Sequence, residues 1–326
     1  FFQKIAYLPN AIGLIIGSIM NLSYGINFLL GRVSGVICYA LIMYAAMKKL
    51  SSGKLLVAVV ALLPTNVFQA ANYTYDAWIV CMVAFAVSNM VSWLQDEKKT
   101  VQIKNIVLVL TILALAIAPK GIYFPLCLLF LMVPAIKFDD VKQYRLYVFA
   151  VLGTTLICFL VYMLLPFLAG KNQGDTRFGS EISTIGQIVY ILKNPITFAK
   201  NLVLFLKGYL SLENSFDYTC FWAYLTPSRV DYHTTLMVLL FVSAVVDRRE
   251  YDQLYNTRKV KIGVSTLLYV IAAMVATVLY LSCSPVGSDV INGCQPRYLA
   301  PMVFPFLMFV CNFGCFNTKN YKSLQA

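Results

Sequence analysis

The stretch APKGIYFPLCLLFLMVP, residues 118–134, decides how the rest of the chain is arranged. It places Lys120 and Gly121 between two apolar runs that together are too long for one membrane span. A hairpin turning at Lys120 gives two short helices, whereas one long helix kinked at Pro119 would reverse the side of every later loop. We predict the hairpin, because the kinked helix would move the basic loop at 248–261 to the outer side.

The composition is that of a membrane protein. Of the 326 residues, 60% are apolar and 12% are charged, which leaves too little polar surface for a soluble globule of this size. No GxGxxG, P-loop or DxD-type motif occurs in the sequence. The chain begins at Phe1 without a signal-peptide pattern, so we expect it to be an N-terminally truncated piece of a longer reading frame.

Apolar runs bounded by charged or turn residues predict an all-α, polytopic integral membrane protein with about nine transmembrane helices. Several runs are short, since a helix of about 15 residues rises only about 22 Å against a hydrocarbon core of about 30 Å. The still shorter run at 9–20 predicts a re-entrant or interfacial helix. The nine predicted spans are 26–47, 55–69, 77–94, 105–119, 122–136, 146–169, 233–247, 260–282 and 298–316.

Basic residues gather in alternate loops of this nine-span arrangement. Sixteen of the 26 Lys and Arg residues fall on one side, which the positive-inside rule assigns to the cytoplasm. We therefore predict a multi-pass plasma-membrane protein with a cytoplasmic C-terminus, and the net charge of +12 needs no nucleic-acid partner. The sixteen residues are Lys48, Lys49, Lys54, Lys98, Lys99, Lys104, Lys137, Lys142, Arg145, Arg248, Arg249, Arg258, Lys259, Lys261, Lys319 and Lys322.

The predicted spans divide the chain into three parts. Residues 1–169 form an N-terminal membrane region, 170–232 an extracytoplasmic loop with amphipathic helices, and 233–326 a C-terminal membrane region. About 60 loop residues with little apolar content cannot build a large core, so a second folded domain is not expected there.

One segment of this loop, IGQIVYILKNPITFAKNLVLFLKGYL at 185–210, is amphipathic. Pro195 should break it into two helices. Lys193, Lys200 and Lys207 recur every seven residues on the polar side. Either the pair lies on the outer leaflet with solvated lysines, or these lysines form a surface for the phosphates of anionic lipid or glycan.

Two charged residues near the ends of predicted spans each have two interpretations. Asp76, in NYTYDAW at 72–78, is either a helix N-cap or a base or sugar ligand beside Tyr73 and Tyr75. Arg32, in GRVSG, lies roughly 9 Å deep by helical rise. It is either a snorkelling anchor or a site residue lining a wet cavity.

The turn GCQPRYLAP, residues 293–301, gives Arg297 neighbours that suit a phosphate. Arg297 is either an interfacial anchor with Tyr298 as a belt aromatic, or a guanidinium fork for phosphate with Gln295 as a second donor. Lys120, in the predicted hairpin on the same side, would lie within reach of a lipid head group. These residues make up the candidate site.

Five stretches carry a family resemblance in sequence and order: YLPNAIGLIIG, LLGRVSG, LLPTNVFQAANYTYDAW, APKGIYFPLCLLFLMVP and INGCQPRYLAPMVFPF. Over nearly the whole chain they resemble the bacterial membrane-protein family catalogued as domain of unknown function 2142, which is similar to the GT-C class of polyprenyl-phosphate-dependent glycosyltransferases. Pro296 stands where that family usually carries Gly. GT-C enzymes also keep an acidic residue in their first outer loop, which would lie upstream of Phe1.

The resemblance implies an inverting transfer of a sugar from a polyprenyl-phosphate donor to a cell-envelope glycan or lipid acceptor. Asp76 would be the base, unless the upstream acid serves. Arg297, Lys120 and Arg32, with Gln295 and Tyr298, would bind the donor phosphate. The implied partners are the bilayer, the lipid-linked sugar and the glycan acceptor. No resident cofactor is expected, and the need for a divalent cation stays open. A transporter or flippase for a lipid-linked saccharide is the alternative, because it needs similar cations.

Overall fold

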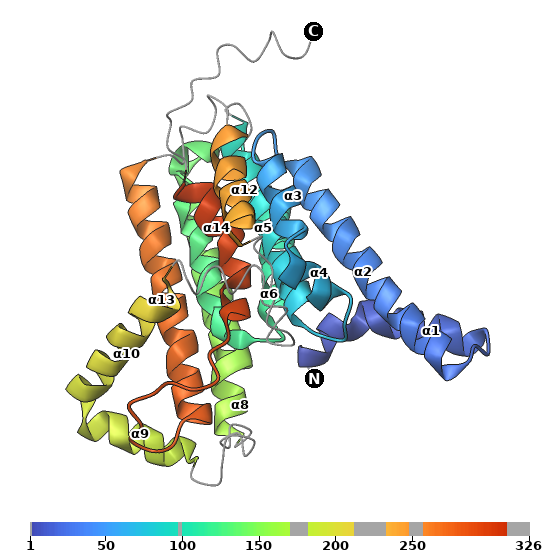
Figure 1. Cartoon of the computed structure of the whole chain (residues 1–326). Coiled ribbons are helices and arrows are strands. Elements are labelled where there is room, and N and C mark those ends of the chain that lie inside the picture. The colour runs from blue at the N-terminus through green and yellow to red at the C-terminus, as the bar shows by residue number, and fades with distance from the viewer. Residues whose placement is uncertain (1, 97–99, 170–181, 212–232, 248–256, 312–326) are drawn as a thin grey trace.

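The computed structural model describes residues 2–96, 100–169, 182–211, 233–247 and 257–311, and every regular element in these ranges is a helix (Figure 1). The predicted all-α class is therefore confirmed for this part of the chain. The predictions on Lys98, Lys99, Arg248, Arg249, Lys319, Lys322 and the rest of the 170–232 loop lie outside the described residues.

The first third of the chain alternates short and long helices. The 3-10 helix η1 (Phe2–Tyr7) leads into α1 (Leu8–Ile19), and a turn joins α1 to the long α2 (Tyr24–Lys49). Two short helices, α3 (Lys54–Ala61) and α4 (Pro64–Ala70), precede α5 (Asp76–Gln95). Pro64 opens α4, because proline suits a first helical turn but not the interior of a continuous helix.

The middle of the chain holds α6 (Ile103–Ile117), the 3-10 helices η2 (Gly121–Met132) and η3 (Ala135–Lys137), α7 (Val141–Phe159), the π-helix η4 (Leu160–Leu164) and α8 (Leu165–Leu168). The remaining elements are α9 (Thr184–Lys193), α10 (Pro195–Tyr209), α12 (His233–Val246), α13 (Arg258–Cys283), η7 (Pro296–Leu299) and α14 (Ala300–Phe309). The side chains of Asp140, Ser183 and Thr257 cap α7, α9 and α13 by accepting the N–H three residues on.

The prediction of nine transmembrane helices is wrong for the described residues. Among them, four helices are long and apolar enough to cross a membrane, or five if the bent pair α9 and α10 is one span. The four are α2, α5, the continuous run Val141–Leu168, and α13. The other predicted spans hold short helices: α6 has 15 residues and rises about 22 Å, and α14 has 10 and rises about 15 Å.

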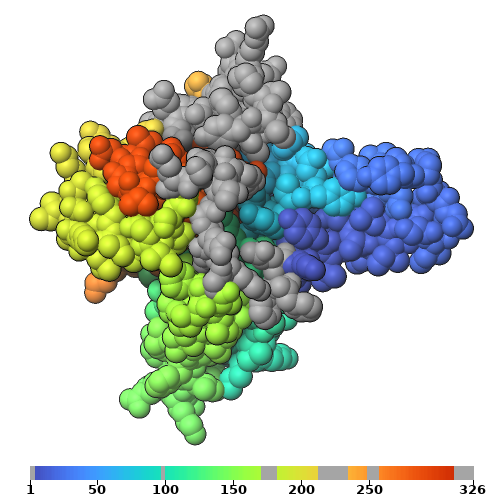
Figure 2. Space-filling model, turned by 90° about the horizontal axis from the view of Figure 1, so that it is seen from below, coloured from blue at the N-terminus to red at the C-terminus, as the bar shows by residue number. Residues whose placement is uncertain are grey.

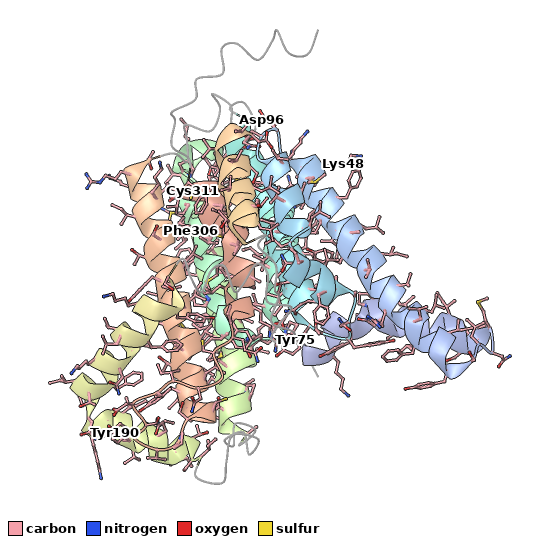
Figure 3. The ribbon with its side chains drawn as sticks, in the orientation of Figure 1. Lys48, Tyr75, Asp96, Tyr190, Phe306 and Cys311 are labelled. Carbon is pink, nitrogen blue, oxygen red and sulfur yellow. The ribbon has the colours of Figure 1, made fainter. Side chains whose placement is uncertain are left out.

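The loops predicted to share one side nevertheless lie together. At one end of the bundle the Gly53 N–H donates to the Asp247 carbonyl at 2.9 Å, and the Val101 N–H donates to the Lys137 carbonyl at 2.8 Å. The second bond joins the residues just before α6 to the end of η3, so the chain turns back at Lys120. This confirms the predicted hairpin. Figure 3 shows Lys48 and Asp96 at that same end and Tyr190 at the opposite end.

Helix α5 is the central element. It packs against α2, α4, α6 and α14, and 83% of its most apolar window is buried inside the protein. The corresponding windows of α2 and α13 are only 17% and 33% buried. An apolar helix that protein surrounds can hold a charged residue at its end away from lipid, as α5 does with Asp76.

Helix α1 and the first half of α2 project from the bundle as an arm (Figures 1 and 2). Close approach of the two helices depends on glycine, since a Cβ on Gly13 would lie 2.5 Å from the Leu30 carbonyl oxygen. The Asn10 side chain also donates to the Gly31 carbonyl at 2.9 Å. Helix α1 exposes Ile12, Ile15 and Ile19, which suits the predicted re-entrant or interfacial helix.

Candidate functional site

Asp76 and Arg297 form an ion pair between the first residue of α5 and the 3-10 helix η7. Arg297 Nε lies 3.7 Å from Asp76 Oδ2, which is too long for a hydrogen bond. Asp76 is 8% exposed. The N-cap interpretation of Asp76 is wrong, because Tyr75 occupies the cap position and no side-chain hydrogen bond closes the first turn. The carboxylate is buried beside the guanidinium instead.

Lys120 belongs to the same cluster. Its ammonium lies 3.0 Å from the centre of the Tyr298 ring and 5.6 Å from that of Tyr123, and no described residue accepts a hydrogen bond from it. Burial lowers the pKa of Lys120 to about 7, while the nearby Asp76 carboxylate opposes this shift and Arg297 adds to it. Near neutral pH this buried lysine therefore exchanges between its neutral and its cationic form.

Tyrosines fix the backbone on which Arg297 and Tyr298 lie. The Tyr123 hydroxyl donates to the Tyr298 carbonyl at 2.8 Å, which joins the hairpin at Lys120 to η7. The Tyr209 hydroxyl, from α10, donates to the Gln295 carbonyl at 2.8 Å. Pro296 opens η7 with a fixed φ angle, so the backbone is held on both sides of Arg297.

Arg32 lies in a different contact. Its Nε donates to the Ala71 carbonyl at 2.6 Å, at the C-terminal end of α4. The cations that act electrostatically on Asp76 are Lys120 and Arg297. The structure thus gives Arg32 a structural partner between α2 and α4 and does not bring it into the Asp76 cluster.

The three loop lysines also lie outside the cluster. Lys193, Lys200 and Lys207 are exposed on α9 and α10, which bend by 107° at the predicted break. Two hydrogen bonds hold these helices to the 284–295 segment, from the Gly287 N–H to Gln187 at 2.9 Å and from Asn201 to Asp289 at 3.1 Å. The predicted amphipathic pair is present, and its binding of lipid or glycan stays a prediction.

The cluster of Asp76, Lys120 and Arg297 carries two cations and one carboxylate. Lys120 Nζ, Arg297 Nε and the Gln295 side-chain oxygen are buried without a hydrogen-bond partner among the described residues. Unused donors on buried cations suit an anionic ligand such as a phosphate. A single carboxylate flanked by cations does not supply the several oxygen ligands that a divalent cation needs.

Sequence reasoning missed Tyr123 and Tyr209 as supports of this cluster. Tyr123 stands three residues after Lys120, so its position in the same turn could have indicated that it lies near the cluster. Tyr209 lies in the amphipathic segment, and only the fold brings α10 against Gln295.

In the described part of the chain, four apolar helices of membrane-spanning length and a cluster of buried charges at helix ends define a polytopic membrane protein. Within that class, the chain belongs to the family described as "Predicted membrane protein (DUF2142)", which matches residues 2–306. The predicted resemblance to this family is thereby confirmed, and the similarity to the GT-C class stays a prediction. No curated protein and no solved structure matches the chain.

Proposed function

We propose that this protein is a GT-C-like, inverting glycosyltransferase. It would move a sugar from a polyprenyl-phosphate donor to a hydroxyl of a cell-envelope glycan or lipid at the outer face of the bacterial plasma membrane. The strongest support is that one buried carboxylate, Asp76, lies near two cations, Lys120 and Arg297. A candidate general base and candidate phosphate ligands are therefore close together.

Lys120 and Arg297 are suited to the donor phosphate. The guanidinium presents a planar fork of donors that matches phosphate oxygens, and the ammonium supplies a compact charge from a separate element. Tyr298 lies beside both, with the Arg297 guanidinium 5.6 Å and the Lys120 ammonium 3.0 Å from its ring centre. A phosphate that replaced the ring as partner of Lys120 would satisfy donors that are unpaired within the described chain.

In the proposed reaction the bond between the sugar's anomeric carbon and the phosphate oxygen breaks, and polyprenyl phosphate leaves with the bonding electron pair. The acceptor oxygen attacks the anomeric carbon from the opposite side, which inverts its configuration. Asp76 accepts the proton of the acceptor hydroxyl. Lys120 and Arg297 stabilise the negative charge that grows on the departing phosphate.

The test is sugar transfer by the purified protein in lipid nanodiscs, from isotope-labelled polyprenyl-phosphate sugars to envelope glycan or lipid acceptors. Asp76→Asn removes the base and should lower turnover by about a hundredfold or more. Arg297→Lys keeps the charge but loses the fork, with an expected loss of about a hundredfold.

Matched controls are Asp289→Asn and Arg258→Lys, since Asp289 pairs with Asn201 outside the cluster and Arg258 starts α13, with its side chain exposed. Both should keep their turnover. Transfer at the normal rate by well-folded Asp76→Asn and Arg297→Lys proteins would refute the assignment of these roles.

The alternative, a flippase for a lipid-linked saccharide, shares the need for cations. Its binding site is expected near the membrane midplane between inverted repeats. Asp76 is instead the first residue of α5, and Lys120 lies in the turn between α6 and η2, so both stand at helix ends. Movement of the donor across proteoliposomes with its sugar–phosphate bond intact, and without transfer, would favour the flippase over our proposal.

A further inference from the structure

The helix pair α9 and α10 presents a surface that the proposed reaction does not use. Together the two helices are apolar enough to cross a membrane, but their bend of 107° prevents one straight span. Helix α9 has 10 residues and α10 has 15, so they rise only about 15 Å and about 22 Å. Figure 3 shows Tyr190 of α9 at the end of the molecule opposite Lys48 and Asp96. A short apolar helix pair in this position suits the interface between lipid and water.

One side of each helix packs on the protein. Leu206 and Tyr209 of α10 are buried, and Gln187 of α9 is completely buried. The Tyr209 hydroxyl donates to the Gln295 carbonyl, and the Gln187 side chain accepts the Gly287 N–H. These contacts fix which side of each helix faces away from the protein.

The side of α10 that faces away carries lysines and apolar residues together. Ile196, Lys200, Val203 and Lys207 follow one another at intervals of three or four residues, which places them in one stripe along the helix. All four are exposed, with Ile196 at 84% and Val203 at 58%. The surface therefore has both a cationic and an apolar component.

The charge of this stripe is not neutralised within the described residues. Residues 184–210 contain three lysines and neither Asp nor Glu. Asp289 contacts α10 through Asn201 but forms no ion pair with a lysine in the described part of the chain. A lysine stem can lie along apolar chains while its ammonium group stays at the level of the head groups. The stripe thus matches a ligand with an anionic head and apolar tails.

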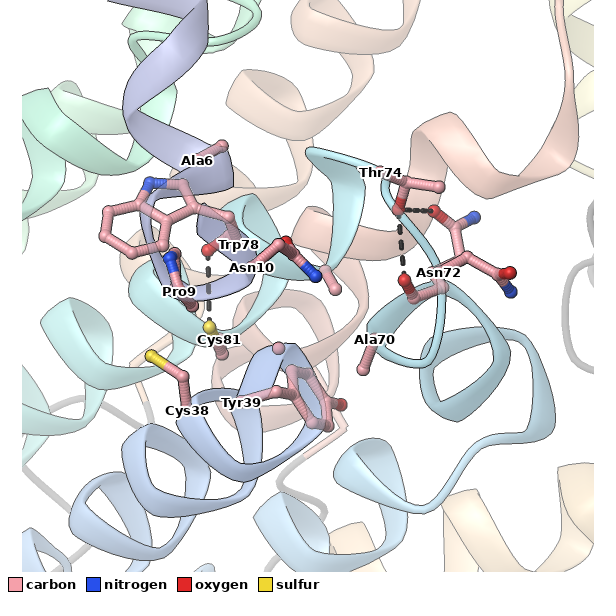
Figure 4. A pocket seen from close by; sticks show the side chains of 13 residues that line it. Ala6, Pro9, Asn10, Cys38, Tyr39, Ala70, Asn72, Thr74, Trp78 and Cys81 are labelled. Atoms are coloured by element: carbon pink, nitrogen blue, oxygen red, sulfur yellow. Dashed lines mark hydrogen bonds between the residues drawn. The ribbon is translucent and has the colours of Figure 1, made fainter. Parts of the chain in front are cut away.

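A small cavity between α1, α2 and α5 does not fit such a ligand. Asn10, Cys38, Thr74 and Trp78 are among the residues that line it (Figure 4). Its volume is about 20 Å³, which has room for about one water molecule. The stripe on α10, by contrast, is open to the lipids of the surrounding leaflet.

We propose that the exposed stripe of α10, together with Lys193 at the end of α9, binds anionic phospholipid. The ammonium groups of the lysines pair with lipid phosphates, and the lipid chains lie on Ile196 and Val203. Lys200 and Lys207 stand seven residues apart, which is about 10.5 Å along the helix axis, so they serve separate phosphate groups.

The experiment uses phosphatidylglycerol and phosphatidylcholine that carry the same diazirine-labelled chain, each added to the purified protein in phosphatidylcholine nanodiscs. Crosslinked residues are identified by mass spectrometry. Phosphatidylglycerol should label residues 192–207 at least about fivefold more than phosphatidylcholine, the effect of one lysine near an anionic lipid surface. The double variant Lys200→Gln, Lys207→Gln should lose this excess, and Lys200→Arg, Lys207→Arg should keep it because the charge is retained.

Lys104→Gln with Lys142→Gln is the matched control, because both lysines are exposed, on α6 and α7, outside this surface. It removes the same charge and should leave the labelling of α10 unchanged. Equal labelling by the two lipids, or an excess that survives in Lys200→Gln, Lys207→Gln, would overturn the proposal. Lysine-dependent binding of soluble poly(glycerol phosphate), with equal labelling by the two lipids, would show instead that the surface takes a glycan phosphate.

Discussion

Lys120 is a buried cation that rests on an aromatic ring in place of a hydrogen-bond acceptor. The groups facing it are the Asp76 carboxylate, the Arg297 guanidinium and the Cys294 thiol. Burial raises the pKa of that thiol to about 11, so the thiol stays neutral near neutral pH, whereas the lysine, with a pKa of about 7, changes charge there. Its protonation should therefore be coupled to anion binding.

We predict that affinity for a polyprenyl-phosphate sugar falls as pH rises from 7 to 9. Below the pKa of about 7 the free protein already holds the Lys120 proton. Above it, binding an anion must take up a proton, because the phosphate favours the ammonium form. The dissociation constant should rise by up to about tenfold per pH unit, the limit for one linked proton. The measurement is a binding titration in nanodiscs, and the diester probe itself does not titrate in this range.

Lys120→Arg is the control for this pH dependence. A guanidinium stays charged throughout the range, so the variant should show a flat affinity between pH 7 and 9. A flat profile in the unmodified protein would contradict the assignment of Lys120 as the phosphate ligand.

At the level of single residues, the sequence indicates the participants but not their contacts. Lys120 and Arg297 could be predicted from a charge in a hairpin turn and an arginine fixed between prolines. Arg32 appeared equivalent by depth, and only the fold shows that it serves the Ala71 carbonyl. For Asp76 the sequence left an N-cap and a base or sugar ligand open, and the structure places its carboxylate beside Arg297, from a distant element, and not in a cap.

At the level of elements, apolar runs locate helices but do not determine their type or length. The run after Lys120 folds as the 12-residue 3-10 helix η2, which contains Pro125 and buries Leu126, Cys127, Leu129 and Phe130 completely. Lipid-facing and protein-facing helices are both apolar, so composition does not distinguish the exposed α2 from the buried α5. This is why the prediction named nine spans where the described residues hold four helices of membrane-spanning length.

The hairpin packs through Gly121, and we predict that Gly121→Ala destabilises the protein. An added Cβ would lie 2.6 Å from Tyr162 Cβ and 2.7 Å from its carbonyl oxygen, in η4. Backbone cannot yield as a flexible side chain would, so the expected loss is about 1 to 3 kcal/mol in the free energy of unfolding. Thermal unfolding in detergent measures it.

Gly153 in α7 gives the matched control, because a Cβ there would meet nothing within 4 Å. Gly153→Ala should leave the melting temperature unchanged or raise it, since alanine is the better helix former. Equal melting of the Gly121→Ala and Gly153→Ala proteins would show that the hairpin does not need the close approach.

At the level of the whole molecule, alternate loops lie at opposite ends, although several of the helices between them are short. The predicted grouping of the basic loops is correct although the predicted number of spans is wrong, because the grouping depends on which loops lie together and not on helix length. The grouping of residues 53, 101, 137 and 247 at one end could thus be predicted. The depth of each short helix could not, because a bundle can shield segments that are too short to span lipid alone.

We predict that Lys54→Cys is shielded from an impermeant thiol reagent in intact cells and that Lys193→Cys is labelled. Both side chains are exposed, and they lie in the regions that the positive-inside rule assigns to opposite sides. The experiment requires a background in which the native cysteines are replaced. Labelling of Lys54→Cys without permeabilisation would invert the assigned orientation.

The pairing of Asp76 with Arg297 has a kinetic consequence in the proposed reaction. The carboxylate is the counter-charge of the guanidinium, with Asp76 Oδ2 3.7 Å from Arg297 Nε. An incoming phosphate must compete for that guanidinium, and once it binds, the carboxylate has lost its counter-charge and attracts a proton more strongly. Substrates would then bind in a fixed order, donor before acceptor. An acceptor that bound first would find Asp76 a weaker base, because Arg297 would still be its counter-charge.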